Sequence, residues 1–586
     1  MKLHKKALAV LLGAAVTLSS VCFAVRPAAS GGLVSGAMVT DNNGYGYHRE
    51  TVSQPSKPAK AAKAPLRGAK SSLPSYYDSR SLGIIPAVRN QGITGTCWAF
   101  AATGALKIDA VKKGYEDVSS PAYSPSHLAW FSTTMSDNPG DPFYGEGLSA
   151  PSPYFAGGNW MYATSTLSEG SGIASTADFP FYPYDTSAMI YTEADRYDRG
   201  SGYMIDSSCV LPDASAMKSW VMEHGAFTMA IYYDSACENP ATSAYYSAGA
   251  GGADVINHNI TVVGWDDDYP ASSFLTQPAS NGAWLVMDSW GISRHSSGFY
   301  WLSYCEESIN YTVGFTARST GNYLSNYSYN GCYYNWFIGT GEGEFTVANV
   351  FEAKYSENIN AVSFITCEGG DTVNIKIYKN PPASSLSGGT LAADFDVSAD
   401  YEGYHTAAVP QPVALSPGDK FAVVLEISNP SAEVYVPVEN PAYDDGTAVY
   451  TSNPGESFYY LNGQWNDTAG DEYGNLFIQA FTSCNHVISV QTSEPTCTED
   501  GYFFYGCTQC GETIMEEHYP ATGHTFSDWI YSGETAASHI STRTCTVCGE
   551  TETRKTPKGT NTITIDELLN IIFTKIFYAL FRIEFK

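Results

Sequence analysis

The stretch QGITGTCWAF, residues 91–100, places one cysteine, Cys97, between a turn of small residues and an apolar run. The residues that follow, WAFAATGALKIDAVKKG, have apolar side chains at helical spacing and end in two lysines and a glycine. This pattern predicts a helix that begins at Cys97. Unpaired N–H groups and the helix dipole stabilise a thiolate at such a position, so Cys97 is a candidate nucleophile.

A thiolate nucleophile needs a base, and two later segments supply the candidates. INHNITVVGWDDD (256–268) puts His258 at the head of a β-prone run, and GAWLVMDSWG (282–291) is an apolar strand that carries Asp288 and Trp290. Cysteine, histidine and a third polar group form the general set of nucleophile, base and orienting group.

These three blocks resemble the signature blocks of the papain-like cysteine peptidases. FAGGNWMY (155–162), FYPYD (181–185) and HGAFTMAIYYD (224–234) agree with intermediate blocks in the family's order. The resemblance covers about residues 73–316 and is closest to exported bacterial members with a lectin-like β-domain after the peptidase. It implies an α+β fold with a helical lobe and a β-barrel lobe, and a cysteine endopeptidase that needs no cofactor or metal for catalysis.

The resemblance also implies a role for each matching residue. Cys97 is expected to be the nucleophile and His258 its general base and later acid, with Asp288 orienting the imidazole. The side-chain amide of Gln91 and the backbone N–H of Cys97 are expected to bind the oxyanion. The remaining expected positions support the site or line the substrate cleft: Trp290, Gly157 and Gly158.

Two positions depart from the family pattern. Asp288 stands where the family usually has Asn; both accept the imidazole N–H, but the negative charge of Asp is expected to raise the histidine pKa. Thr94 stands where the family often has a disulfide cysteine, so the loop before Cys97 is expected to hold its shape by packing alone. The other cysteines of this region, Cys209, Cys237 and Cys305, cannot be paired from the sequence.

The N-terminus predicts export. Residues 1–24 combine three lysines, an apolar core and the cleavage site CFA, which is typical of a bacterial signal peptide. Residues 25–72 are rich in Ala, Gly, Ser, Pro and Lys, and we expect a propeptide or linker. Without residues 1–72 the chain has 21 basic and 58 acidic residues, so a nucleic-acid partner is excluded and a secreted or surface-associated protein is favoured.

Residues 73–318 are predicted to form the peptidase domain and residues 319–482 a β-sandwich. In the latter, apolar runs such as TVNIKIYK and FAVVLEIS alternate with turn residues. Its aromatic side chains fit either the core of the sandwich or stacking on the sugar rings of a carbohydrate or cell-surface polymer.

Residues 484–556 contain two copies of the pattern H-x20-C-x2-C-G-E-T, 38 residues apart, which we assign to 484–523 and 524–556. The spacing fits structural zinc, and disulfide bonding that involves Cys497 is the alternative. His518 and His539 are both candidates to complete the second set. The candidate ligands are Cys484, His486, Cys507 and Cys510 in the first copy, and His524, Cys545 and Cys548 in the second.

The last segment, 562–586, is predicted to form an amphipathic helix with a narrow polar stripe. It is too short and too charged for a membrane crossing, which leaves a membrane surface, a partner or the protein's own surface as its contact.

The sequence as a whole predicts a secreted cysteine endopeptidase. Two other functions remain open: a transglutaminase-like acyl transferase, which the order Cys, His, Asp also suits, and a catalytically silent adhesin that binds glycan or cell wall. The phosphate-loop and H-E-x-x-H motifs are absent from the sequence, so no motif supports an ATPase or a zinc protease.

Overall fold

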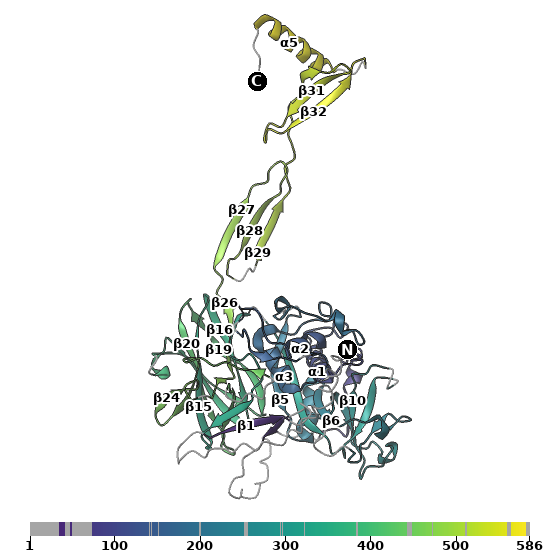
Figure 1. The fold of residues 1–586 in the computed structure, drawn as a ribbon, viewed down its shortest axis with the longest axis vertical. Coiled ribbons are helices and arrows are strands. Elements are labelled where there is room, and N and C mark those ends of the chain that lie inside the picture. Colours follow the sequence, from purple (N-terminus) through teal and green to yellow (C-terminus); the bar gives the residue numbers. More distant parts are fainter. Residues whose placement is uncertain are drawn as a thin grey trace, which may run out of the picture. The chain divides into compact units, whose positions relative to one another are not determined.

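The computed structural model forms two compact units, Met1–Asn485 and His486–Lys586. The first unit contains a first domain (residues 73–319) and a β-rich second domain (residues 323–485) (Figure 1). The predicted signal peptide and most of the predicted linker lie outside the described residues. The structure describes residues 34–40, 47–49 and 73–581, except 140, 142, 151, 198–200, 251–255, 293–294, 296, 321–322, 383–384, 442–447, 472, 510–512 and 560–563.

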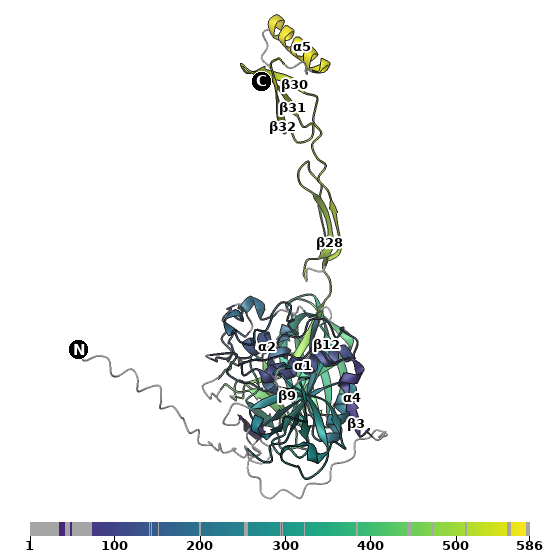
Figure 2. The ribbon, with the colours of Figure 1, turned by 90° about the vertical axis from the view of Figure 1, so that its right-hand side faces the viewer.

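The predicted helix after Cys97 is confirmed as α1 (Cys97–Lys112), which ends before Gly114, a residue in the left-handed region with φ 71°. Every residue from Cys97 to Ala110 is buried, because α1 lies beside β9 (His258–Asp266) and β12 (Asn310–Ser319) (Figure 2). The other helices of the first domain are α2 (Pro125–Phe131), α3 (Trp160–Thr166) and α4 (Ala214–His224).

Helix α1 carries two charged residues into this buried environment, and both are paired. Lys107 forms an ion pair with Glu116, and Asp109 lies 2.8 Å from Lys113 and 2.9 Å from His224. Pairing is required because an unpaired buried charge costs several kcal/mol.

The predicted strands around the histidine and the aspartate are confirmed. Strand β9 pairs with β10 (Ala283–Met287) on one side and with β6 (Phe227–Ile231) on the other. The remaining strands of this part of the sheet are β3 (Tyr76–Asp78), β5 (Tyr203–Val210), β7 (Glu238–Asn239), β8 (Ala244–Tyr245) and β11 (Phe299–Ser303).

The second domain is made of antiparallel strands whose apolar faces enclose its own core. One layer contains β13 (Tyr323–Tyr327), β16 (Glu357–Thr366), β19 (Gly403–Leu415) and β26 (Ile478–Cys484). A six-stranded layer contains β15 (Glu344–Glu352), β17 (Asp371–Lys379), β18 (Thr390–Ala399), β20 (Lys420–Ser428), β23 (Ser457–Leu461) and β24 (Gln464–Asp467).

The two domains share one continuous sheet. Strand β19 of the second domain pairs with β5 of the first, with Gly403 opposite Cys209, and a Cβ at Gly403 would lie 1.9 Å from the Ser208 carbonyl oxygen. A second link pairs β4 (Gly147–Leu148) with β22 (Ala448–Val449). A further sheet joins β1 (Val34–Thr40) and β2 (Tyr47–Arg49), within the predicted linker, to β14 (Trp336–Gly339), β21 (Tyr435–Glu439) and β25 (Asn475–Leu476).

The second unit contains two three-stranded sheets, one in each sequence repeat, and helix α5 (Ile565–Phe581), which contacts β30. The helix lies inside the predicted segment 562–586. The strands are β27 (Ile488–Ser493), β28 (Gly501–Cys507), β29 (Thr513–Tyr519), β30 (Ile530–Glu534), β31 (Ser538–Thr544) and β32 (Thr551–Pro557).

Candidate active site

Cys97, His258 and Asp288 come together from three separate elements of the first domain. Cys97 is the first residue of α1, His258 is the first residue of β9, and Asp288 directly follows β10. Because β9 and β10 are paired, the His258 ring reaches the carboxylate, and its Nε2 lies 3.0 Å from Oδ1 of Asp288. All three residues are buried.

The charges of this set favour a thiolate–imidazolium pair. Burial by itself lowers the pKa of His258, but its contacts with Asp288 and Cys97 outweigh burial and raise that pKa to about 9. Burial by itself raises the pKa of Cys97, but its interaction with His258 lowers that pKa below the ordinary thiol value. Both shifts stabilise a deprotonated Cys97 beside a protonated His258.

Trp290 covers the histidine. The rings of His258 and Trp290 stack with centroids 4.0 Å apart and an angle of 4° between their planes. Tyr233 packs against Trp290 from another direction, at 5.0 Å between ring centroids. The stack limits the imidazole to one plane, in which the hydrogen bond to Asp288 sets its direction.

Gln91 is held in one orientation by two hydrogen bonds. Ser289 Oγ donates to Gln91 Oε1 at 2.6 Å, and Gln91 Nε2 donates to the Thr94 carbonyl at 2.7 Å. An amide nitrogen carries two protons, so the hydrogen bond to Thr94 uses only one of the two on Nε2. The backbone N–H of Cys97 lies in the first turn of α1, where N–H groups have no partner within the helix.

The expectation that the loop before Cys97 is held by packing alone is wrong, because Thr94 pins it with hydrogen bonds. Its Oγ1 donates to the Gln91 carbonyl at 2.9 Å and lies 2.6 Å from Thr96 Oγ1. Gly92 is required here, since its φ is 62° and a Cβ would lie 2.0 Å from the Pro183 carbonyl oxygen. A polar network thus occupies the place of the family's usual disulfide.

The two glycines of the expected cleft have different structural roles. Gly157 is in the left-handed region with φ 77°. A Cβ at Gly158 would lie 2.3 Å from Trp98 Cε2, so the space beside Gly158 is filled by the Trp98 ring. Gly95 lies against Gly157, because its Cβ position is 3.6 Å from the Gly157 nitrogen.

A second histidine, which no sequence motif pointed to, contacts the other oxygen of Asp288. His295 Nε2 lies 3.2 Å from Asp288 Oδ2, and His295 Nδ1 lies 3.2 Å from Glu238 Oε1. Burial by itself raises the pKa of Asp288, but its contacts with His258 and His295 lower that pKa to about 2. The Asp288 carboxylate therefore stays charged between two imidazole rings. In the sequence, only the presence of Asp288 where the family usually has Asn indicated that the surroundings of this residue are unusual.

Opposite shifts of the alkaline limit of activity are expected from two substitutions. Asp288→Asn removes the negative charge that stabilises the His258 imidazolium, so the falling limb of kcat/KM, expected near pH 9, moves to lower pH. Burial by itself lowers the pKa of His295, but its contacts with Asp288 and Glu238 raise that pKa to about 9. His295→Gln therefore removes a positive charge facing the same carboxylate, so that limb moves to higher pH. Profiles of kcat/KM against pH measure both, and limbs that stay in place in both variants would contradict this charge balance.

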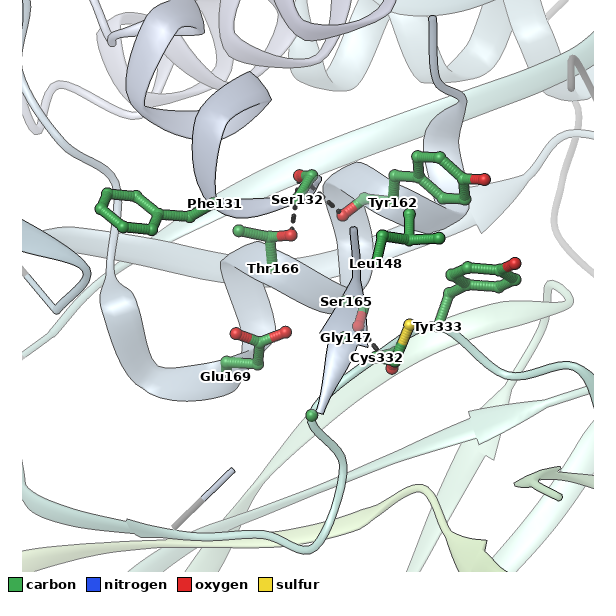
Figure 3. Close-up of a pocket in the computed structure, with 11 residues that line it drawn as sticks. Phe131, Ser132, Gly147, Leu148, Tyr162, Ser165, Thr166, Glu169, Cys332 and Tyr333 are labelled. Atoms are coloured by element: carbon green, nitrogen blue, oxygen red, sulfur yellow. Dashed lines mark hydrogen bonds between the residues drawn. The ribbon is translucent and has the colours of Figure 1, made fainter. Parts of the chain in front are cut away.

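A separate pocket lies where the two domains meet (Figure 3). In it, Ser165 Oγ donates to the Cys332 carbonyl at 2.6 Å, and the hydroxyls of Ser132 and Thr166 are 2.7 Å apart. Glu169 lines the pocket, and burial raises the pKa of its carboxyl well above the ordinary value. Cys97, His258 and Asp288 are not among its lining residues. The pocket belongs to the contact between domains.

The predicted metal ligands have different outcomes. The first set is divided between the two units, because Cys484 ends β26 in the first unit whereas His486 and Cys507 belong to the second. Its fourth member, Cys510, lies outside the described residues. The first set therefore stays a prediction. Of the second set, His524, Cys545 and Cys548 do come together, and Cys497 joins them. The other two candidates pair elsewhere: His518 with Glu516 at 2.9 Å and His539 with Glu534 at 3.4 Å.

Comparison with known proteins agrees with this fold. Residues 73–315 match the family of papain family cysteine proteases, and residues 327–482 match the lectin like domain family. Residues 73–315 are therefore a papain-like domain, and residues 327–482 are a lectin-like domain that follows it.

The relatives include cathepsin K of Mus musculus, 28% identical over 246 residues, which are 39% of this chain and 60% of that protein. Cathepsin S of Bos taurus is 27% identical over 242 residues, 39% of this chain and 59% of that protein. The chain thus spans about 60% of the length of these curated relatives.

One solved structure covers both domains. It contains the cysteine protease and lectin-like domains of Cwp84, a surface layer associated protein of Clostridium difficile. It matches with a TM-score of 0.61 over 72% of this chain and 90% of that chain, at 23% identity. The match establishes the fold: a papain-like α+β domain joined to a lectin-like β-rich domain.

Proposed function

We propose that this protein is a secreted cysteine endopeptidase that hydrolyses peptide bonds through an acyl-enzyme intermediate. One observation carries the proposal: Cys97 begins a buried helix beside a histidine that Asp288 and Trp290 fix in place. The raised pKa of His258 and the lowered pKa of Cys97 support a thiolate nucleophile near neutral pH.

In the proposed mechanism the Cys97 thiolate attacks the carbonyl carbon of the scissile bond. The oxyanion that forms accepts hydrogen bonds from Gln91 Nε2 and the Cys97 backbone N–H. The His258 imidazolium gives its proton to the leaving amine, which leaves a thioester on Cys97. Neutral His258 then takes a proton from water, hydroxide attacks the thioester, and the thiolate and the imidazolium are restored.

Hydrolysis and acyl transfer are distinguished by their products. The purified protein is incubated with an unblocked peptide library and a primary amine, and the products are identified by mass spectrometry. We expect peptides cleaved by addition of water. Amine incorporation at glutamine side chains without cleavage would instead support the transglutaminase-like alternative, and neither product would support the adhesin.

We propose that the lectin-like domain attaches the enzyme to carbohydrate or to a cell-surface polymer. The family match of residues 327–482 supports this, and the predicted signal peptide supports export.

In the part of the chain that the structure describes, none of the helices has both the length and the hydropathy that a bilayer crossing requires. Helix α5 exposes Ile565 and Phe573 at 77% and 67%, which supports a contact with a membrane surface.

A further inference from the structure

Four metal-binding side chains meet in the second unit. Cys497 comes from the loop between β27 and β28, and His524 from the connection between β29 and β30. Cys545 and Cys548 come from the turn between β31 and β32. Their sulfur and nitrogen atoms all lie within 4.8 Å of one another, and the three cysteines are free thiols.

The distances within this cluster match a tetrahedral zinc site. With Zn–S of about 2.3 Å and Zn–N of about 2.0 Å, a tetrahedron separates two sulfurs by about 3.8 Å and a sulfur and a nitrogen by about 3.5 Å. The Sγ atoms of Cys497 and Cys545 are 3.7 Å apart, and Sγ of Cys548 is 3.3 Å from Nδ1 of His524.

The histidine is oriented as a ligand. Nε2 of His524 lies 3.0 Å from Oε2 of Glu550, which leaves Nδ1 facing the thiols. A carboxylate on the far nitrogen of a ligating imidazole fixes its tautomer and ring orientation, and metal sites commonly have such a partner.

Backbone hydrogen bonds hold the ligand loops in place. The N–H of Cys545 donates to the Glu550 carbonyl at 2.7 Å, and the N–H of Gly549, with φ 78°, returns to the Cys545 carbonyl at 3.0 Å. The N–H of Thr522 donates to the Thr496 carbonyl at 2.9 Å, which brings the segment before His524 to the loop of Cys497. The cluster is therefore a built feature and not a chance meeting of flexible side chains.

In its described part, the second unit has no hydrophobic core apart from this cluster. From residue 486 onward, the apolar side chains that the structure shows as buried are all cysteines: Cys497, Cys507 and Cys545. Small modules without a sufficient hydrophobic core need disulfides or a structural metal, and binding of the metal then supplies much of the folding free energy.

We propose that Cys497, His524, Cys545 and Cys548 bind one structural zinc ion, whose fourth ligand comes from the first sequence repeat. Three thiolates and one imidazole suit zinc, and four protein ligands leave no open position for catalysis. A disulfide between Cys497 and Cys545 would leave Cys548, His524 and its carboxylate partner without a function. The zinc ion therefore joins the two repeats to each other.

The test measures zinc per chain by elemental mass spectrometry on the full protein, in a Cys97→Ala background that prevents self-digestion. We expect Cys497→Ser and Cys548→Ser each to lose about one zinc per chain, while the matched control His518→Gln loses none. Substitution with cobalt should give a tetrahedral thiolate spectrum that loses the intensity of one site in Cys497→Ser.

Limited proteolysis supplies a second readout that does not depend on how well a variant folds. Removing zinc from the Cys97→Ala protein with a chelator should speed cleavage within residues 486–581 at least about tenfold, and added zinc should reverse this. Zinc content unchanged in Cys497→Ser, or a disulfide between Cys497 and Cys545 in a zinc-free product, would overturn the proposal. Peptidase activity of Cys497→Ser in the otherwise unchanged protein reports on the proposed function separately.

Discussion

Cys97→Ala is expected to lower kcat/KM for peptide hydrolysis by about 10⁴-fold or more, because no other group in the site can form the acyl-enzyme. The substitution removes only a sulfur atom at the buried start of α1, so folding should persist. Assays with a fluorogenic peptide, together with circular dichroism of the variant, measure the two effects separately.

Cys209 is a matched control, since it is also a buried thiol of the first domain, and burial raises its pKa to about 12. A thiol-directed epoxide, mapped by mass spectrometry, should modify Cys97 in the wild type and in Cys209→Ala. A wild type with no label on Cys97, or activity of Cys97→Ala within tenfold of wild type, would exclude Cys97 as the nucleophile.

Gln91→Glu is expected to lower kcat by about 10²–10³-fold with little change in KM, because an oxyanion donor is lost and a negative charge replaces it. The two side chains have the same length and both accept from Ser289 Oγ, but the carboxylate cannot donate to the Thr94 carbonyl as Gln91 Nε2 does. Steady-state kinetics on one peptide separate kcat from KM.

Ser289→Ala is the companion variant, because it keeps the amide of Gln91 and removes only the hydroxyl that orients it. We expect kcat to fall about tenfold or less. If Ser289→Ala and Gln91→Glu lowered kcat equally, the effect would come from distortion of the loop, and Gln91 would not be assigned to the oxyanion.

Prediction from sequence succeeded where the signal was local. The apolar spacing after Cys97 predicted α1, and the β-prone runs predicted β9 and β10. Helical and strand periodicity depend on neighbours a few residues away, so they can be read without knowing the fold. The repeated H-x20-C-x2-C pattern likewise led to three of the four residues that meet in the second unit.

The local sequence could not reveal partners that meet only after folding. His295 lies against Asp288, and Glu238 lies against the other nitrogen of His295, because three separate segments converge there. Cys497 joins His524 from 27 positions earlier, and no spacing rule connected it to the second repeat. From the sequence, Thr94 indicated only that a disulfide is absent; in the structure its hydroxyl donates to the Gln91 carbonyl.

The sequence by itself determined the helix that begins at Cys97, the strand that begins at His258 and the order of the papain-like and lectin-like domains, because these follow from residue type and short-range spacing. Only the tertiary structure decided that β5 and β19 make one sheet of two domains, that Asp288 lies between two histidines, and that Cys497 completes the second cluster. These contacts are set by the pairing of strands and loops distant in sequence, and such pairing depends on the packing of the whole chain.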